Sequence, residues 1–141
     1  MLNDIYRGLI LVAPHGTYIQ QDTKHTIIKS VNFPDIAHKP LLLIEDKMAI
    51  GIIQLDNPKK INLHEFKNKY HEHHITEKER VVWWPEKHVL YEYKIIKKDI
   101  FEKPIHFNYK QGPQIVVKPE NIWQIIPKKY NIGTSGYEYD S

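Results

Sequence analysis

The segment around residue 15 carries the first side chains that could bind an anion. The run Pro-His-Gly-Thr-Tyr occupies residues 14–18, and Lys24 and Lys29 follow it. Gly16 would let a turn bring backbone N–H groups close to a phosphate, while His15 and Tyr18 could stack or hydrogen-bond. The lysines would attract the phosphate. The alternative is an ordinary turn between strands with solvated lysines.

A second candidate lies near the middle of the chain, where Arg80 precedes two tryptophans. On the helix expected there, Arg80 and Trp84 are four residues apart and share a face, whereas Trp83 points elsewhere. We expect one tryptophan to fill the core and the other to offer a stacking surface for a base beside the guanidinium group. The alternative is that both tryptophans are core residues and that Glu77 or Glu79 pairs with Arg80.

The histidines at residues 71–74 resemble the start of a metal site. His71 and His74 would lie on adjacent turns of a helix. No third ligand stands at a fixed spacing, and Thr76 is expected to begin a new helix, so we predict no metal site. The chain contains no cysteine, which excludes disulfides, thiolate metal sites and a cysteine nucleophile. No Gly-rich phosphate-binding fingerprint is present either, and we expect no cofactor.

Length and composition predict one ordinary globular domain. The 141 residues are 41% hydrophobic and 26% charged, which excludes a wholly disordered chain. A net charge of +3 permits nucleic-acid binding without requiring it. The longest apolar runs are much shorter than the ~20 residues of a membrane span, and we recognise no signal peptide. We therefore expect a cytoplasmic protein that does not bind membranes.

The first half of the chain has the pattern of strands. Apolar and β-branched runs bounded by turn residues predict strands over residues 8–13, 24–33, 40–45 and 47–55. Pro14 and Gly16 would end the first strand in a turn. Gly51 interrupts the last of these strands and predicts a bulge or a close approach of two backbones.

The middle of the chain changes to a helical period. Asn62 is predicted to cap a helix that runs to about His73, and Thr76 with Glu79 predicts a capping box for a second helix, which Pro85 stops. Strand patterns then return. We expect strands over residues 88–98, 104–109 and 114–118, and a short helix or turn over residues 120–126.

This order of elements predicts an α+β fold, with a small bent β-barrel and two short helices inserted between strands. Alternation of strands and helices with a parallel sheet is not what the pattern shows. We expect a single domain over residues 1–126 and a flexible tail over residues 127–141.

The order of motifs resembles that of ASCH domains, a group within the PUA-like superfamily. The resemblance rests on Leu-Leu-Leu-Ile at 41–44, Ala-Ile-Gly-Ile-Ile at 49–53, a helix with a Trp-containing end, and Leu-Tyr-Glu-Tyr-Lys-Ile at 90–95. Residues 22–29 stand where that group usually has a Gly-x-Lys-Thr-x-Glu-x-Arg-like strand, although Asp22 replaces the Gly and Lys29 the Arg. The resemblance spans roughly residues 8–118. It implies a small β-barrel with flanking helices and a cleft that binds RNA or modified bases.

We therefore interpret the chain as a binding domain for RNA or another single-stranded nucleic acid. A basic, aromatic cleft would hold an unpaired or modified base by stacking and phosphate attraction. The expected nucleic-acid-binding residues are His15, Thr17, Tyr18, Lys24, Lys29, Arg80, Trp83 and Trp84.

Two other functions stay open. Some proteins of the resembling group hydrolyse acylated nucleosides with a Lys, a Thr and a distant Glu. Lys24 could match that Lys as nucleophile or base of an amidohydrolase or a ribonuclease, if burial lowers its pKa, but Thr26 is displaced by one residue from the expected Thr position. Tyr18 or His15 would then donate a proton, and a carboxylate such as that of residue 45 or 79 would assist. The other function is a protein-interaction module, consistent with nine tyrosines and three tryptophans.

Overall fold

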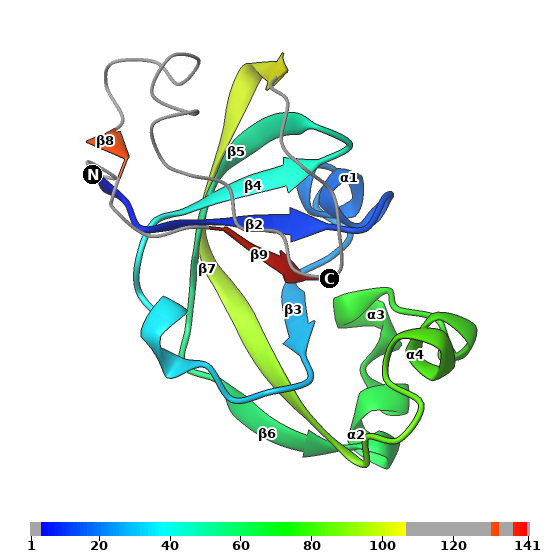
Figure 1. Cartoon of the computed structure of the whole chain (residues 1–141). Helices are drawn as coiled ribbons and strands as arrows, with labels where there is room; N and C mark the ends of the chain where they lie inside the picture. The colour runs from blue at the N-terminus through cyan, green and yellow to red at the C-terminus, as the bar shows by residue number, and fades with distance from the viewer. Residues whose placement is uncertain (1–3, 107–130, 133–136, 141) are drawn as a thin grey trace.

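One strongly curled sheet organises the molecule (Figure 1). The computed structural model describes residues 4–106, 131–132 and 137–140. Within them the sheet has the strand order β3-β7-β5-β4-β2-β9, and β6 pairs with β7 beside this path. Its strands are β2 (Arg7–Leu11), β3 (Thr26–Lys29), β4 (Leu41–Glu45), β5 (Met48–Leu55), β6 (Lys59–Asn62), β7 (Val89–His106) and β9 (Tyr137–Asp140). The predicted α+β fold with a small barrel-like sheet is confirmed.

Tight local geometry produces the curl. Strands β4 and β5 form an antiparallel hairpin whose corner residues, Asp46 and Lys47, have φ angles of 51° and 60°. The prediction for Gly51 is confirmed, because the register of β5 against β7 shifts between Ala49 and Gly51. A Cβ at Gly51 would lie 2.7 Å from the carbonyl oxygen of Asp99, so only glycine lets the two backbones approach this closely. In this sheet β2 pairs in parallel with β4 and β9, and the other pairs are antiparallel.

The longest strand, β7, connects β3 and β6 to the rest of the sheet. Its first part pairs with β3 and β6, and the rest pairs with β5. It covers residues 89–98 of the predicted strand 88–98 and the beginning of the predicted strand 104–109, which the sequence predicts as two separate strands. The predicted strand over 114–118 and helix or turn over 120–126 lie outside the described residues. Two strands fall within the predicted tail: β9, and β8 (Asn131–Ile132), which pairs with β1 (Asp4–Ile5). The domain boundary itself stays a prediction.

Three short helices cover the β3 end of the sheet (Figure 1): α2 (Leu63–Asn68), α3 (Tyr70–His73) and α4 (Glu77–Trp83). Both predicted caps are confirmed, since Asn62 and Thr76 each form a complete capping box. The single helix predicted to run to His73 is wrong. The Phe66 carbonyl accepts from the Lys69 N–H (3.1 Å) and from His73 Nε2 (2.7 Å), and this ends α2 before α3 begins.

The turn predicted at Pro14 to Gly16 is confirmed only at its start, where residues 13–14 form a turn and the His15 N–H donates to the Val12 carbonyl (2.9 Å). Helix α1 (His15–Gln20), which the sequence did not predict, follows directly. A contact with β4 holds it: Glu45 accepts hydrogen bonds from the Thr17 N–H (2.9 Å) and the Thr17 hydroxyl (2.7 Å). A Cβ at Gly16 would lie 3.0 Å from the Glu45 side chain, so the glycine makes room for this carboxylate. The strand predicted over residues 24–33 is shortened to β3, and a 3₁₀ helix η1 (Pro34–Ile36) follows.

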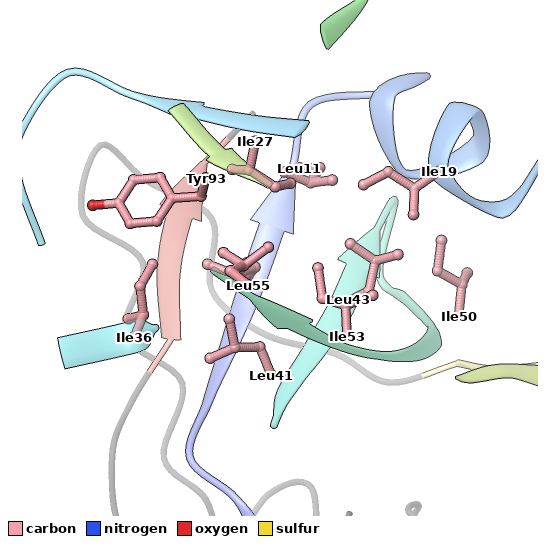
Figure 2. Close-up of a cluster of buried hydrophobic side chains, with 11 residues drawn as sticks. Leu11, Ile19, Ile27, Ile36, Leu41, Leu43, Ile50, Ile53, Leu55 and Tyr93 are labelled. Carbon is pink, nitrogen blue, oxygen red and sulfur yellow. The ribbon is translucent and has the colours of Figure 1, made fainter. Parts of the chain in front are cut away.

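Two apolar clusters make up the interior. The main core lies inside the curl (Figure 2). It is formed by side chains of α1, η1, β2, β4 and β5, together with Ile27 of β3 and Tyr93 of β7. The second cluster lies under α2 to α4 and contains Ile28, Ile61, Phe66, Ile75 and Leu90. Trp83 and Trp84 both pack against this second cluster and are both half-buried, so the expectation of one core and one exposed tryptophan is wrong. No helix among the described residues is long and apolar enough to cross a membrane.

Candidate functional site

A row of rings runs across α1, α3 and α4, and we call it the aromatic row. Successive ring centroids are 5.2, 5.4, 5.6, 5.6 and 5.6 Å apart in the order Tyr70, His74, Tyr18, His15, Trp83, Trp84. These are contact distances for aromatic side chains. One end is open to solvent, since Tyr70 is 46% exposed, whereas His15 near the centre is fully buried. The row therefore joins an exposed face to a buried imidazole.

His15 is held by α4. Its Nε2 lies 2.9 Å from Oε2 of Glu79. Because a carboxylate only accepts, Nε2 carries the hydrogen and Nδ1 keeps its lone pair. Nδ1 is buried and has no hydrogen-bond partner within the described part of the chain. Burial, reinforced by the positive charge of Lys24, lowers the pKa of His15 in spite of the bond to Glu79, so the imidazole is neutral at pH 7.

Glu79 is itself fixed by the cap of α4. Its Oε1 accepts from the Thr76 N–H (2.9 Å), while Oε2 faces His15. Burial raises the pKa of Glu79, but the hydrogen bonds from the Thr76 backbone and from His15 outweigh it and leave the pKa lowered. The carboxylate is therefore ionised at pH 7 and points at the imidazole in one orientation. The capping box that begins α4 thus also positions the partner of His15.

Lys24 is buried next to these groups, with only 1% of its surface exposed. Its ammonium group donates to the carbonyl of His73, and its backbone N–H donates to the carbonyl of Tyr18 (3.1 Å). Buried lysines are rare in proteins. The neighbouring Thr26 hydroxyl is also buried, without a partner among the residues described. Burial lowers the pKa of His73 to about 4, although the Phe66 carbonyl opposes the shift.

A pocket of about 180 Å³ opens beside Lys24, and we call it the basic pocket. It is lined by Asp22, Lys24, His25, Ile95, Ile96, Lys97 and Lys98. Lys98 donates to the Ile19 carbonyl (2.9 Å) and to the Asp22 carboxylate, and the bond from Lys98 lowers the pKa of Asp22. His25 and Lys97 are exposed at the pocket. The pocket therefore carries more positive than negative groups.

Four of the eight expected residues, His15, Tyr18, Trp83 and Trp84, belong to the aromatic row. Lys24 lies where the row meets the basic pocket, and Thr17 is bound to Glu45 instead of leaving its N–H open to an anion. Lys29 is the last residue of β3 and belongs to neither the row nor the pocket, and its ammonium group lies 5.5 Å from the centroid of the Phe33 ring. A role for these residues in nucleic-acid binding stays a prediction.

Arg80 forms the pair that the sequence leaves open as an alternative. Its Nε donates to Glu77 (2.8 Å), and a second nitrogen donates to the same oxygen. This bond raises the pKa of Arg80 and lowers that of Glu77. With 8% of its surface exposed, Arg80 is mostly buried beside the half-buried tryptophans.

The histidines at residues 71–74 are separated by the structure. His71 is exposed beside Glu72 (3.7 Å), whereas His74 contacts the rings of Tyr18 and Tyr70. Across residues 4–106 and the two short described strands, no group of three or more His, Asp or Glu side chains is arranged to hold a metal ion.

Sequence reasoning missed two residues of this site. Tyr70 has the spacing of a core position on a helix, and its spacing gives no sign that it is exposed. His25 reaches the basic pocket because its N–H donates to the Glu72 carbonyl (2.7 Å), a contact 47 residues away in sequence. Local patterns carry no signal for such a contact.

No protein-family model matches the sequence. No curated protein matches it either. Among solved structures, the fold is similar to the crystal structure of ASCH from Zymomonas mobilis, at 10% identity and a TM-score of 0.66, over 89% of this chain and 96% of that one. Two mutants of that protein are also similar. One has 12% identity and a TM-score of 0.60 over 70% and 73% of the two chains, and the other has 13% and 0.59 over 86% and 88%.

Proposed function

Because the chain has the fold of an ASCH-type domain, we propose that it binds RNA, or another single-stranded nucleic acid, through an unpaired or modified base. The observation that carries this proposal is the junction of the aromatic row and the basic pocket. The Tyr18 carbonyl accepts from the Lys24 N–H (3.1 Å), so a ring of the row and a residue of the pocket are tied directly together. A nucleotide likewise joins a planar base to a phosphate.

The open end of the row supplies the stacking surface. Tyr70 is 46% exposed, and its neighbours His74 and Tyr18 are half-buried, so this part of the row is open for a base to stack on it. Stacking of a base on an aromatic side chain contributes about 1–3 kcal/mol. It tolerates any base, because each base has a flat face.

The basic pocket supplies the attraction for phosphate. His25 and Lys97 are exposed at its rim, and Lys98 lies beside them. Such contacts release counterions from the strand, so the affinity should fall steeply with salt. The clustering of lysines at this pocket favours a nucleic acid over the protein partner that the sequence leaves open.

A fluorescence titration with short single-stranded RNA at two salt concentrations tests the proposal. The chain has three tryptophans, so a Trp123→Phe background leaves Trp83 and Trp84 of the aromatic row as the reporters. We expect quenching that weakens with salt. Tyr70→Ala should weaken binding at both salt concentrations.

The charge contribution has a matched control. Lys97→Gln should lower the salt dependence by about one phosphate contact. Lys60→Gln removes an equally exposed lysine from β6 and should leave binding unchanged. Absence of binding at low salt, or an equal effect of the two lysine variants, would contradict the proposal.

The burial of Lys24 favours a second candidate function, a small hydrolase. Lys24 is 1% exposed and lies close to the His15–Glu79 pair, so a buried amine, an imidazole and a carboxylate stand together. In the hydrolysis of an acylated nucleoside, water adds to the acyl carbon, the C–N bond breaks, and the amine leaves with a proton. Incubation with an N-acetylated nucleoside and with RNA tests this function. Turnover that Lys24→Met abolishes supports it, and turnover that survives this substitution removes Lys24 from the reaction.

A further inference from the structure

One buried polar atom in the candidate site lacks a partner. His15 is fully buried, and its Nδ1 has no hydrogen-bond partner among the residues that the structure describes. Buried polar atoms are nearly always hydrogen-bonded, so an exception at a candidate site calls for an explanation. A ligand that donates a hydrogen bond to Nδ1 would provide one.

We propose that His15 Nδ1 is the acceptor that recognises an N–H group on the edge of the bound base, and that Glu79 is the positioning residue that keeps Nδ1 an acceptor. This inference rests on the proposed function, since it concerns the same site and a nucleic-acid base. It adds a specificity to that function. The site selects a base by its N–H edge as well as by stacking.

Glu79 determines which ring nitrogen carries the hydrogen. Its two oxygens have separate partners, the Thr76 N–H on Oε1 and His15 Nε2 on Oε2, both at 2.9 Å. The carboxylate accepts both bonds, so the hydrogen of the neutral imidazole stays on Nε2 and the lone pair stays on Nδ1. The nearby ammonium group of Lys24 disfavours a second proton on the ring.

The neighbours of the imidazole suit a planar ligand. The rings of Tyr18 and Trp83 meet it edge-on with centroids 5.6 Å away, and both rings are half-buried. Trp83 is the last residue of α4, and Trp84 follows it before Pro85. Because His15 is fully buried, a base can reach Nδ1 only if a neighbouring ring moves aside, and a movement of the Trp83 indole would change the tryptophan fluorescence that reports binding.

The experiment compares a short oligouridylate with the same strand built from 3-methyluridine. Methylation removes the ring N–H of uracil and leaves its flat face. The wild-type protein should bind the uridine strand roughly tenfold more tightly or better, because the methylated strand leaves the buried acceptor without a partner. His71→Gln, which replaces an exposed imidazole on α3, is the matched control and should keep this preference.

Glu79→Gln separates recognition by Nδ1 from the bulk of the methyl group. The Gln oxygen is expected to accept from the Thr76 N–H, which turns the amide NH₂ toward His15 Nε2. The ring hydrogen then moves to Nδ1, which becomes a donor, and the preference for uridine should disappear. The ¹⁵N spectrum of the histidine rings reports this change of tautomer directly. His15→Phe, which keeps the ring shape without the acceptor, serves if Glu79→Gln does not fold.

Each result has one meaning. A preference for uridine that is lost in Glu79→Gln or His15→Phe supports the inference. Equal binding of the two strands by the wild-type protein overturns the inference and leaves the proposed RNA binding intact. A preference for uridine that survives in the variants has the same meaning, because the methyl group then acts only by its bulk. Failure to bind either strand refutes the proposed function and this inference with it.

Discussion

The main core and the candidate site are both buried, but they are built from opposite kinds of residue. The main core consists of ten aliphatic side chains and Tyr93, whose hydroxyl accepts from the Phe33 N–H (2.7 Å) (Figure 2). The site instead buries His15, Lys24, Thr26 and His73 beside half-buried aromatic rings. Burial of apolar groups is favourable, whereas burial of polar groups costs free energy unless they are hydrogen-bonded.

This contrast shows that the two regions are stabilised in different ways. In the main core each side chain contributes to stability by leaving water. In the site specific partners hold several of the buried polar groups, such as Glu79 for His15 Nε2 and the His73 carbonyl for Lys24, whereas His15 Nδ1 and the Thr26 hydroxyl have no hydrogen-bond partner among the described residues. Such a region is costly to maintain and expected at functional positions. The two regions should therefore respond differently to substitution and to pH.

The largest effect on stability is expected in the main core. Leu43→Ala removes a fully buried side chain of β4 and should lower the free energy of unfolding by about 2–5 kcal/mol, through lost burial and a cavity. Denaturant unfolding measures the loss. RNA affinity of the folded fraction should not change, and a large loss of affinity at native conditions would show that core and site are coupled.

The next largest effect is expected from acid, which should lower the stability through the site and not through the main core. The pKa of His73 is lowered from 6.5 to about 4, so between these pH values the unfolded chain binds the proton and the folded protein does not. The contribution of this group to the free energy of unfolding is fully present above pH 6.5. It is lost as the pH drops toward 4, and the loss amounts to about 3 kcal/mol. His15, whose pKa is also lowered, acts in the same direction.

Unfolding at pH 7 and pH 5 measures this loss. His73→Gln cannot titrate, so the difference between the two pH values should shrink in that variant, while Leu43→Ala should show the same difference as the wild-type protein. An unchanged pH dependence in His73→Gln would contradict the assignment.

A smaller loss is expected where the site is anchored to the sheet. Glu45→Ala leaves the Thr17 N–H and hydroxyl without their acceptor and should cost about 1–3 kcal/mol of stability. RNA affinity should fall as well, because α1 carries His15 and Tyr18. Glu45→Gln keeps one acceptor oxygen and should lose less of both. Unfolding and fluorescence titration follow the two losses, and unchanged affinity in Glu45→Ala would show that α1 needs no anchor.

The sequence predicts features that depend on neighbours in the chain. The caps at Asn62 and Thr76 need a partner only three residues away, and Gly51 marks its bulge by its lack of a side chain. The curled sheet could be predicted for the same reason, because strand patterns and turn residues are local features of the sequence. These elements belong mainly to the apolar part of the fold.

Several features of the site depend on partners that are distant in the sequence, and the sequence alone did not predict them. Helix α1, which the sequence did not predict, is held by Glu45, 28 residues away, which binds Thr17. The helix predicted to reach His73 breaks because the His73 ring takes the Phe66 carbonyl. The sequence named His15, Tyr18, Lys24 and Trp83 as site residues, but the pairing of His15 with Glu79 spans 64 residues. No local pattern shows such a pairing.

The smallest effect is expected at the edge of the site, and it decides the role of Arg80. Glu77 is exposed, so its bond to Arg80 is worth at most about 1 kcal/mol, and Glu77→Gln should barely change the free energy of unfolding. RNA binding is the sharper readout. If the guanidinium contacts phosphate, as predicted from its place beside Trp84, removal of the competing carboxylate should raise RNA affinity and steepen its salt dependence. Glu86→Gln, which removes an exposed negative charge just after the same helix, is the control for a change of charge alone. If Glu77→Gln leaves both the affinity and the salt dependence unchanged, the Glu77–Arg80 pair only stabilises α4, and the nucleic-acid site is confined to the aromatic row and the basic pocket.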